Sequence, residues 1–260
     1  MKKFAVLILV CLLLAGCGAE EPETTVSNVT TQQTTAPDPV TAEGIVQAYA
    51  EANGIAYSEW PDSLIKLLDK NPETREFVLN YPQLHDQVQT VDLSDFDGCD
   101  GVPLFLQWDT RWGYLEYGSD VAGITGCGPV CLSMAAYYLT GDSAMSPDRI
   151  IRFALENGYC VSGSGSAWTL ISEGGEKLGL DVTEIPLVEG RIIANLEVDN
   201  PIICIMGPGD FTNNGHFVVM VGYEDGKIRI NDPNSRKNSE KLWDYDQLKD
   251  QINNLWVIRK

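Results

Sequence analysis

The sequence predicts an α+β fold in which helices precede strands along the chain. Apolar residues recur at helical spacing from residue 43 to about residue 90, as in Ile45, Ala48 and Tyr49. Beyond about residue 200 they form short runs bounded by turn residues, as in residues 217–221. Helices followed by strands indicate an α+β arrangement rather than an alternating parallel sheet.

The N-terminus has the pattern of a signal peptide. Two lysines precede an apolar run over residues 4–14, and small residues come directly before Cys17. The pattern resembles the lipobox of bacterial lipoproteins, which implies that residues 1–16 are removed and that Cys17 is lipidated. We therefore expect a protein anchored to the extracellular face of the cell membrane by its N-terminal lipid. A plain secretory signal with an incidental cysteine is the alternative.

Residues 17–42 are predicted to be the lipidated cysteine followed by a disordered tether. From Gly18 to about Thr41 the chain consists mainly of Thr, Glu, Gln, Pro and Ser, and such a composition cannot repay the entropy of ordering. The whole chain carries a net charge of −19. Because this charge repels the phosphate backbone, it argues against nucleic acid as a partner.

Residues 43–100 are predicted to be a helical accessory segment, and residues 101–260 one catalytic domain. In the accessory segment Asn71 has the character of a helix cap and Pro72 that of a first helical residue. Fewer than sixty residues rarely form a core of their own, so we expect the segment to pack on the domain. In the domain we expect helices over residues 128–139, 147–157 and 168–178, and strands over residues 201–206, 216–223, 227–232 and 254–258.

Cys127 is the predicted nucleophile because it opens a helix. In Gly126-Cys127-Gly128-Pro129 the proline suits the first turn of a helix, and the glycines leave room for a substrate backbone. A thiolate there faces unpaired backbone N–H groups and the positive end of the helix dipole, which lowers its pKa. A small buried cysteine at a tight turn is the structural alternative. Cys131 lies one turn deeper, lacks these features and is assigned to the core.

His216 is the predicted base. The chain has two histidines, and a nucleophilic cysteine needs an imidazole to take its proton. His85 lies in a polar stretch of the accessory segment, where an exposed histidine is the ordinary expectation. His216 opens an apolar run, which places it at the mouth of a buried strand, where positioned bases are found.

Asp232 is the predicted partner of the imidazole, preferred to Asn231 because of hairpin register. If residues 224–226 form a three-residue loop, Val218 pairs with Asp232, which then shares a face with His216 and lies diagonal to it. A two-residue turn would instead put Asn231 on that face. We predict the three-residue loop, because the shorter turn would place a proline within the ladder.

Gln107 is the candidate donor to a developing oxyanion, since its amide donates two hydrogen bonds. A surface glutamine is the structural alternative. The loop over residues 162–168 either lines the cleft or is a flexible linker that ends in a core tryptophan.

The remaining cysteines do not indicate a metal site. There is no C-x-x-C pair and there are only two histidines, so we expect no structural metal and no cofactor. The odd number of cysteines beyond residue 17 leaves at least one free thiol; they are Cys99, Cys127, Cys131, Cys160 and Cys204.

Four motifs in this order resemble the bacteriocin-processing, double-glycine type of papain-like cysteine peptidases, in their secreted branch, over about residues 102–260: Gln107-Trp108-Asp109, Gly126-Cys127-Gly128-Pro129, Gly215-His216 and Asn231-Asp232-Pro233. The resemblance implies a helix bearing the nucleophile packed on an antiparallel sheet. It also implies Gln107 as oxyanion donor, Cys127 as nucleophile, His216 as base and Asp232 as orienting acid.

The chain departs from that family in two respects. The leader-processing members are fused to a membrane transporter, and we expect no membrane span here beyond the signal, so double-glycine specificity is not carried over. Cys127 also lies twenty residues after Gln107, with residues 111–117 inserted between them.

The predicted activity is hydrolysis of peptide or amide bonds in a peptide or protein substrate, through a thioacyl-enzyme. A transpeptidase or a cell-wall-peptide hydrolase would use the same site. A surface binding lipoprotein that has lost turnover is the alternative from another class.

Overall fold

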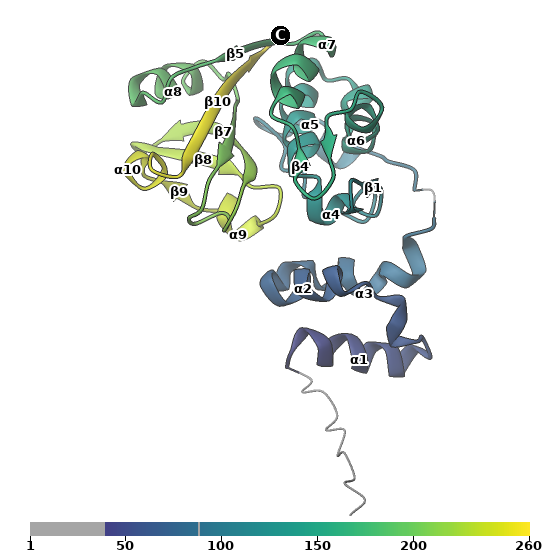
Figure 1. Cartoon of the computed structure of the whole chain (residues 1–260). Helices are drawn as coiled ribbons and strands as arrows, with labels where there is room; N and C mark the ends of the chain where they lie inside the picture. Colours follow the sequence, from purple (N-terminus) through teal and green to yellow (C-terminus); the bar gives the residue numbers. More distant parts are fainter. Residues whose placement is uncertain (1–39, 88) are drawn as a thin grey trace, which may run out of the picture. The chain divides into compact units, whose positions relative to one another are not determined.

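The computed structural model of the chain describes residues 40–87 and 89–260 (Figure 1). The predicted signal peptide, the lipidation of Cys17 and almost all of the predicted tether lie outside the described residues. The helices are α1 (Ala42–Asn53), α2 (Asp62–Lys70), α3 (Arg75–Leu84), α4 (Ala122–Thr125), α5 (Cys127–Thr140), α6 (Pro147–Glu156), α7 (Gly175–Lys177), α8 (Glu189–Leu196), α9 (Arg236–Ser239) and α10 (Tyr245–Leu248).

Ten strands accompany these helices in the described part of the chain. They are β1 (Glu116–Tyr117), β2 (Asp120–Val121), β3 (Cys160–Val161), β4 (Gly165–Ser166), β5 (Asp181–Glu184), β6 (Ile202–Met206), β7 (His216–Glu224), β8 (Lys227–Asn231), β9 (Leu242–Trp243) and β10 (Ile252–Arg259). Six of them form one sheet in the order β5-β10-β6-β7-β8-β9, and every neighbouring pair is antiparallel. The predicted α+β class is confirmed.

Both faces of the sheet are covered. Along β6, Ile203 and Ile205 belong to the apolar cluster that includes α5, whereas Ile202 and Cys204 belong to the cluster that includes α8. Successive side chains of a strand point to opposite faces. A strand between two covered faces must therefore be apolar throughout, as β6 is.

The turn of the β7–β8 hairpin differs from the predicted one. Asp225 and Gly226 form a two-residue turn, with φ angles of 51° and 78° and with Glu224 paired to Lys227. Both angles lie in the left-handed region that a type I′ turn requires, and an Asp-Gly pair favours this turn because its twist matches that of the strands. The three-residue loop was the wrong prediction.

A bulge in β7 nevertheless restores the register expected for Asp232. The ladder shifts by one residue between Met220 and Gly222, and beyond the shift Val219 pairs with Asn231. An extra residue in one strand moves every later pair by one position. The two-residue turn and the bulge together give the alignment at the end of β8 that the longer loop would have given.

The helix that carries Cys127 has nearly the predicted bounds. It ends at Gly141, whose φ of 65° is the left-handed conformation typical of a residue after a helix, and whose N–H donates to the carbonyl of Tyr137. The helix expected over residues 168–178 is divided into a π-helical stretch over Leu170–Gly174 and the short α7. Among the described residues no helix has the length and apolar character needed to cross a membrane.

The helices of the accessory segment share an apolar cluster with the residues that precede the nucleophile. Leu64 and Phe77 lie in the same cluster as Leu106, Trp108 and Tyr114. The hydroxyl of Tyr114 also donates to the carbonyl of Phe77 over 2.7 Å. These helices thus bury their apolar face against residues 104–124 as well as against one another.

Candidate active site

Cys127 is the first residue of α5, and its half-buried side chain lines a cleft. No side chain caps this helix, so its terminal N–H groups remain available to other partners. The backbone N–H groups of Gly128 and of Phe217 on β7 help to lower the pKa of the thiol. A Cβ atom at Gly128 would lie 2.6 Å from Oγ of Ser166. A side chain at this position would displace the wall of the cleft.

His216 begins β7, and its Nε2 lies 2.7 Å from Oδ1 of Asp232, the residue that follows β8. Both side chains are buried, with 7% of His216 and 1% of Asp232 exposed. The last pair of the ladder, Val219 with Asn231, places Asp232 opposite Val218 when it is continued by one residue, and so diagonal to His216 on one face of the sheet. Because Nε2 contacts the carboxylate, Nδ1 is the ring nitrogen that remains for the sulfur of Cys127.

The pKa values of Cys127 and His216 are shifted in opposite directions. Burial raises the pKa of the Cys127 thiol, but the hydrogen bond and charge of His216 and the two backbone N–H groups outweigh burial and lower that pKa below its ordinary value. Burial lowers the pKa of His216, but the Asp232 carboxylate and the Cys127 sulfur outweigh burial and raise it above its ordinary value. The site therefore favours a thiolate paired with an imidazolium.

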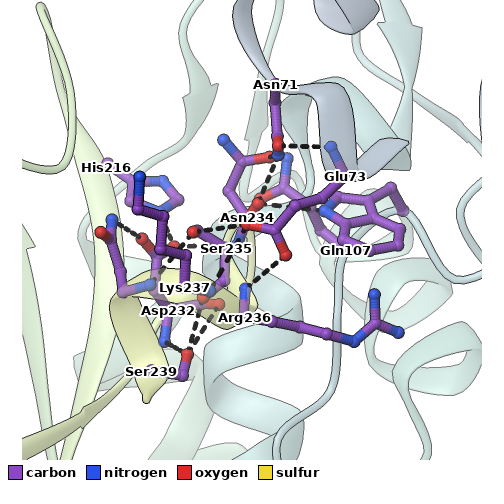
Figure 2. Close-up of polar contacts among 12 residues, drawn as sticks. Asn71, Glu73, Gln107, His216, Asp232, Asn234, Ser235, Arg236, Lys237 and Ser239 are labelled. Carbon is purple, nitrogen blue, oxygen red and sulfur yellow. Dashed lines mark hydrogen bonds and ion pairs between the residues drawn. The ribbon is translucent and has the colours of Figure 1, made fainter. Parts of the chain in front are cut away.

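The carboxylate of Asp232 is held by the short segment that follows it (Figure 2). Oδ1 accepts from the backbone N–H of Asn234 and Oδ2 from the side chain of Asn238, each over 2.8 Å. The backbone N–H of Asp232 donates to Oγ of Ser239 over 2.9 Å. Sequence reasoning missed these three residues. For Asn234 a signal was present in Asn231-Asp232-Pro233-Asn234-Ser235, since an aspartate that accepts from the N–H two residues later forms an Asx turn.

Asn231 serves a different part of the structure. Its amide donates to the carbonyl oxygens of Val102 and Pro103 over 2.9 and 3.2 Å. Successive residues of a strand point to opposite faces, so Asn231 points away from the face that carries His216 and Asp232. Its hydrogen bonds join the start of the predicted catalytic domain to β8.

Gln107 is buried beside the segment that leads to Cys127. Its Nε2 donates to the carbonyl oxygens of Gly123 and Ile124 over 2.9 and 3.2 Å, and its Oε1 is buried without a partner. Only the amide nitrogen can face two carbonyl oxygens favourably, which determines the orientation of the amide. The surface alternative for Gln107 is excluded, since 3% of it is exposed. Its amide N–H groups point to these carbonyls in this conformation.

The cleft beside Cys127 has a volume of about 510 Å³. The loop between β3 and β4 and the start of β7 form its walls, so the loop over residues 162–168 lines the cleft. Trp168 is 45% exposed there and packs edge-on against Trp256 with 6.0 Å between ring centroids. Apart from Cys127, the lining contains no ionisable side chain; it consists of Ile124, Thr125, Cys127, Gly163, Ser164, Gly165, Ser166, Trp168, Ile205, Asn214, Gly215, Phe217 and Asn253.

The other candidate residues lie away from this cleft. Cys131 is fully buried, and burial together with the nearby charges of Cys127, Asp232 and Cys204 raises the pKa of its thiol well above the ordinary value. His85 stacks on Tyr81 in the accessory segment. All five cysteines of the described residues are unpaired.

A helix that presents a cysteine to a histidine and an aspartate of an antiparallel sheet defines the papain-like class of cysteine peptidase folds. The chain belongs to the Peptidase_C39 like family, whose model matches residues 99–260. This places the chain among cysteine peptidases. None of the curated proteins compared with it matches.

Several solved structures are similar to this chain. The peptidase domain of Streptococcus ComA, a bifunctional ABC transporter of a quorum-sensing pathway, is 18% identical over 52% of this chain and 91% of that chain, with a TM-score of 0.40. A double-glycine-motif protease of an AMS/PCAT transporter, in complex with a leader peptide, is 18% identical over 60% and 90%, with a TM-score of 0.41. A C39-like peptidase from Bacillus anthracis is 17% identical over 62% and 98%, with a TM-score of 0.36.

Proposed function

We propose that the protein is a peptidase that cleaves peptide bonds through a triad of Cys127, His216 and Asp232. The observation that carries this proposal is the 2.7 Å contact between His216 and Asp232 beside a cysteine whose pKa is lowered. A thiolate is the reactive form of cysteine, and an imidazolium that remains paired with it is ready to protonate a leaving amine.

In the first half of the proposed reaction, the Cys127 sulfur attacks the carbonyl carbon of the scissile bond. The C–S bond forms as the carbonyl electrons move onto oxygen. His216 then donates the Nδ1 proton to the amide nitrogen, the C–N bond breaks and an amine leaves. In the second half, His216 takes a proton from water, the resulting hydroxide attacks the thioester and the thiolate is released with a carboxylic acid. Asp232 keeps the imidazole oriented through both halves.

The developing oxyanion needs donors near the start of α5. The backbone N–H of Cys127 belongs to the helix terminus, where N–H groups lack partners within the helix. Gln107 is the proposed second donor. Because its amide is directed to the carbonyls of Gly123 and Ile124, we propose that it gives up its longer bond, to Ile124, when the oxyanion forms.

The lining of the cleft supports an uncharged peptide segment as the substrate. Apart from Cys127 the cleft has no ionisable side chain, although the chain as a whole carries −19. The rest of the lining gives no compensation for the desolvation of a charged substrate side chain, so segments with small or neutral polar residues fit best. Trp168 provides an exposed apolar face for one such residue.

The test is reaction of the protein with a peptidyl electrophile, followed by intact mass measurement and mapping of the modified thiol. We expect one adduct, at Cys127, and cleavage of a library of neutral peptides by the untreated protein. Adding an amine nucleophile separates hydrolysis from transpeptidation, because only the latter incorporates the amine. Labelling of Cys131 in place of Cys127 contradicts the proposal. The absence of both labelling and turnover also contradicts it and favours a surface binding protein.

We also propose that the peptidase acts at the cell surface. Support comes from the signal-like sequence that ends at Cys17. Mass spectrometry of membrane-extracted protein should show a lipidated N-terminal fragment beginning at this residue. An unmodified Cys17, or cleavage at another position, overturns this proposal and leaves the triad unaffected.

A further inference from the structure

Two side chains of the accessory segment reach the loop that holds Asp232. Glu73 accepts from the hydroxyl of Ser235 over 2.8 Å and from the backbone N–H of Arg236 over 2.9 Å, with a longer contact of 3.4 Å to that of Lys237. Asn71 donates to the carbonyl of Asn234 over 2.6 Å. Figure 2 shows both side chains above the segment from Asp232 to Ser239. Residues 71 and 73 lie before the part of the chain matched by the family model, which begins at residue 99.

The turn that carries these two side chains is itself ordered by hydrogen bonds. Oδ1 of Asn71 accepts from the backbone N–H of Glu73, and the hydroxyl of the buried Thr74 donates to the carbonyl of Asn71 over 2.7 Å. Pro72 restricts the backbone between them. The side chains of Asn71 and Glu73 are therefore presented by a turn whose backbone is already constrained.

The contacted loop is the one that holds the carboxylate of Asp232. Asn234 donates its N–H to that carboxylate while its carbonyl accepts from Asn71. Ser235 accepts from the backbone N–H of Asn238, whose side chain donates to the carboxylate, while the Ser235 hydroxyl donates to Glu73. Of the two groups that hold the carboxylate, Asn234 is therefore one hydrogen bond away from the accessory segment, and Asn238 is two hydrogen bonds away, through Ser235.

Trp108 makes two further contacts with the same loop. Its indole donates to the carbonyl of Asn234 over 3.1 Å, and the guanidinium of Arg236 lies over the Trp108 ring, 4.7 Å from its centroid. Neither contact involves the backbone N–H of Arg236 or the hydroxyl of Ser235. These two donors have Glu73 as their acceptor.

We propose that Glu73, supported by Asn71, is a positioning residue that holds the Asp232 loop and thereby the imidazole of His216. In this proposal the accessory segment contributes to the alignment of the active site. This inference rests on the proposed function, because it assigns Glu73 a role in the triad that function requires. If the loop shifts, Asp232 loses its alignment with Nε2, and a misplacement of about 1 Å in such a site costs up to about a hundredfold in rate.

The experiment measures the pH dependence of alkylation of Cys127 by iodoacetamide in the full chain, with the modified residue mapped by mass spectrometry. The rate of reaction with iodoacetamide follows the fraction of Cys127 that is thiolate, and it does not depend on peptide binding in the cleft. We expect the wild type to react well below the ordinary thiol pH range. In Glu73→Ala the profile should shift upward by at least one pH unit, which lowers the rate constant at least about tenfold on the acidic limb, at pH values below the apparent thiol pKa of both proteins. Glu73→Gln, which keeps one acceptor oxygen, should shift less.

Glu76→Gln is the matched control, because this residue is an exposed acid of the same segment. It should leave the profile unchanged. Thermal denaturation shows whether Glu73 only stabilises the fold by joining the accessory segment to the loop. An unchanged pH profile in Glu73→Ala, with or without a lower Tm, overturns the inference and leaves the proposed function intact. If Glu73→Ala does not fold, the pH profile is measured in Glu73→Gln and Asn71→Ala instead, and an unchanged profile in both overturns the inference. A wild type without a reactive Cys127 overturns the proposed function and this inference together.

Discussion

The backbone N–H of Gln107 donates to the carbonyl oxygen of Pro233 over 2.8 Å. This bond joins the segment that carries the proposed oxyanion donor to the segment that carries the orienting carboxylate. The two parts of the proposed site are therefore directly connected through the backbone.

Replacement of Gln107 by alanine should separate oxyanion stabilisation from thiol activation. We expect peptide turnover to fall by about 10²–10³-fold, as for loss of one oxyanion donor. Alkylation of Cys127 by iodoacetamide forms no oxyanion and should be almost unchanged. If both rates fall together, Gln107 acts by holding residues 123–124 in place and not as a donor.

Cys127→Ala and Cys131→Ala should have opposite consequences. The first removes the nucleophile at a half-buried helix start, so turnover should be abolished with a nearly unchanged Tm. The second removes a fully buried thiol and should lower the free energy of unfolding by about 1–2 kcal/mol while turnover persists. Denaturant unfolding and peptide cleavage test both; an inactive, normally folded Cys131→Ala would reverse the assignment.

Asp232→Ala should lower kcat by about 10²–10⁴-fold, because the imidazole loses its orienting acceptor. It should also destabilise the fold by about 1–3 kcal/mol, since half-buried donors from Asn234 and Asn238 lose their acceptor. Asp232→Asn, which keeps the shape and one acceptor oxygen, should fall between wild type and alanine in both properties.

Asn231→Ala is the matched neighbour of the Asp232 variants. It removes the amide that bonds to Val102 and Pro103, so its cost should be about 1–3 kcal/mol of stability, with kcat within about tenfold of wild type. Steady-state kinetics on one substrate at one pH, combined with thermal denaturation, test the ranking. A larger kcat loss in Asn231→Ala than in Asp232→Ala would show that Asn231 orients the imidazole.

The pH dependence of kcat/KM should be bell-shaped, with its plateau spanning neutral pH. Activity rises as Cys127 loses its proton, and this limb should lie below the ordinary thiol value of about 8.5 because the pKa is lowered. Activity falls as His216 loses its proton, and this limb should lie above the ordinary imidazole value of about 6.5 because the pKa is raised. In Asp232→Asn the alkaline limb should move to lower pH, because the negative charge that raises the pKa of His216 is gone. An alkaline limb that stays in place would assign that limb to another group.

Trp168→Ala should weaken peptide binding without changing thiol reactivity. Loss of an exposed aromatic face from the cleft should raise KM about tenfold, which corresponds to about 1.4 kcal/mol of binding free energy. Alkylation of Cys127 should be unaffected, since the Trp168 ring packs against Trp256 and makes no hydrogen bond to the triad that would shift the thiol pKa. Val188→Ala, an exposed apolar residue that does not line the cleft, is the control and should leave KM unchanged. Equal effects of the two substitutions would remove Trp168 from the binding site.

Local signals in the sequence were sufficient for the class of fold and for the position of several candidate residues along it. The Gly-Cys-Gly-Pro motif predicts a helix that begins near Cys127, and the apolar run after His216 predicts a strand, because capping preferences and side-chain periodicity act over a few residues. The same signals predicted Cys131 in the core.

Tertiary structure decided what depends on contacts far along the chain. The bulge between Met220 and Gly222 sets which residue faces His216, and a bulge depends on how both covered faces of the sheet pack. The direction of the Gln107 amide depends on two carbonyls sixteen and seventeen residues away. Glu73 lies 162 residues from Ser235, and no local preference links a turn between two early helices to a loop after β8. The sequence specifies the type of each side chain. The pairing of donors with acceptors is decided only when packing brings distant segments within hydrogen-bond range.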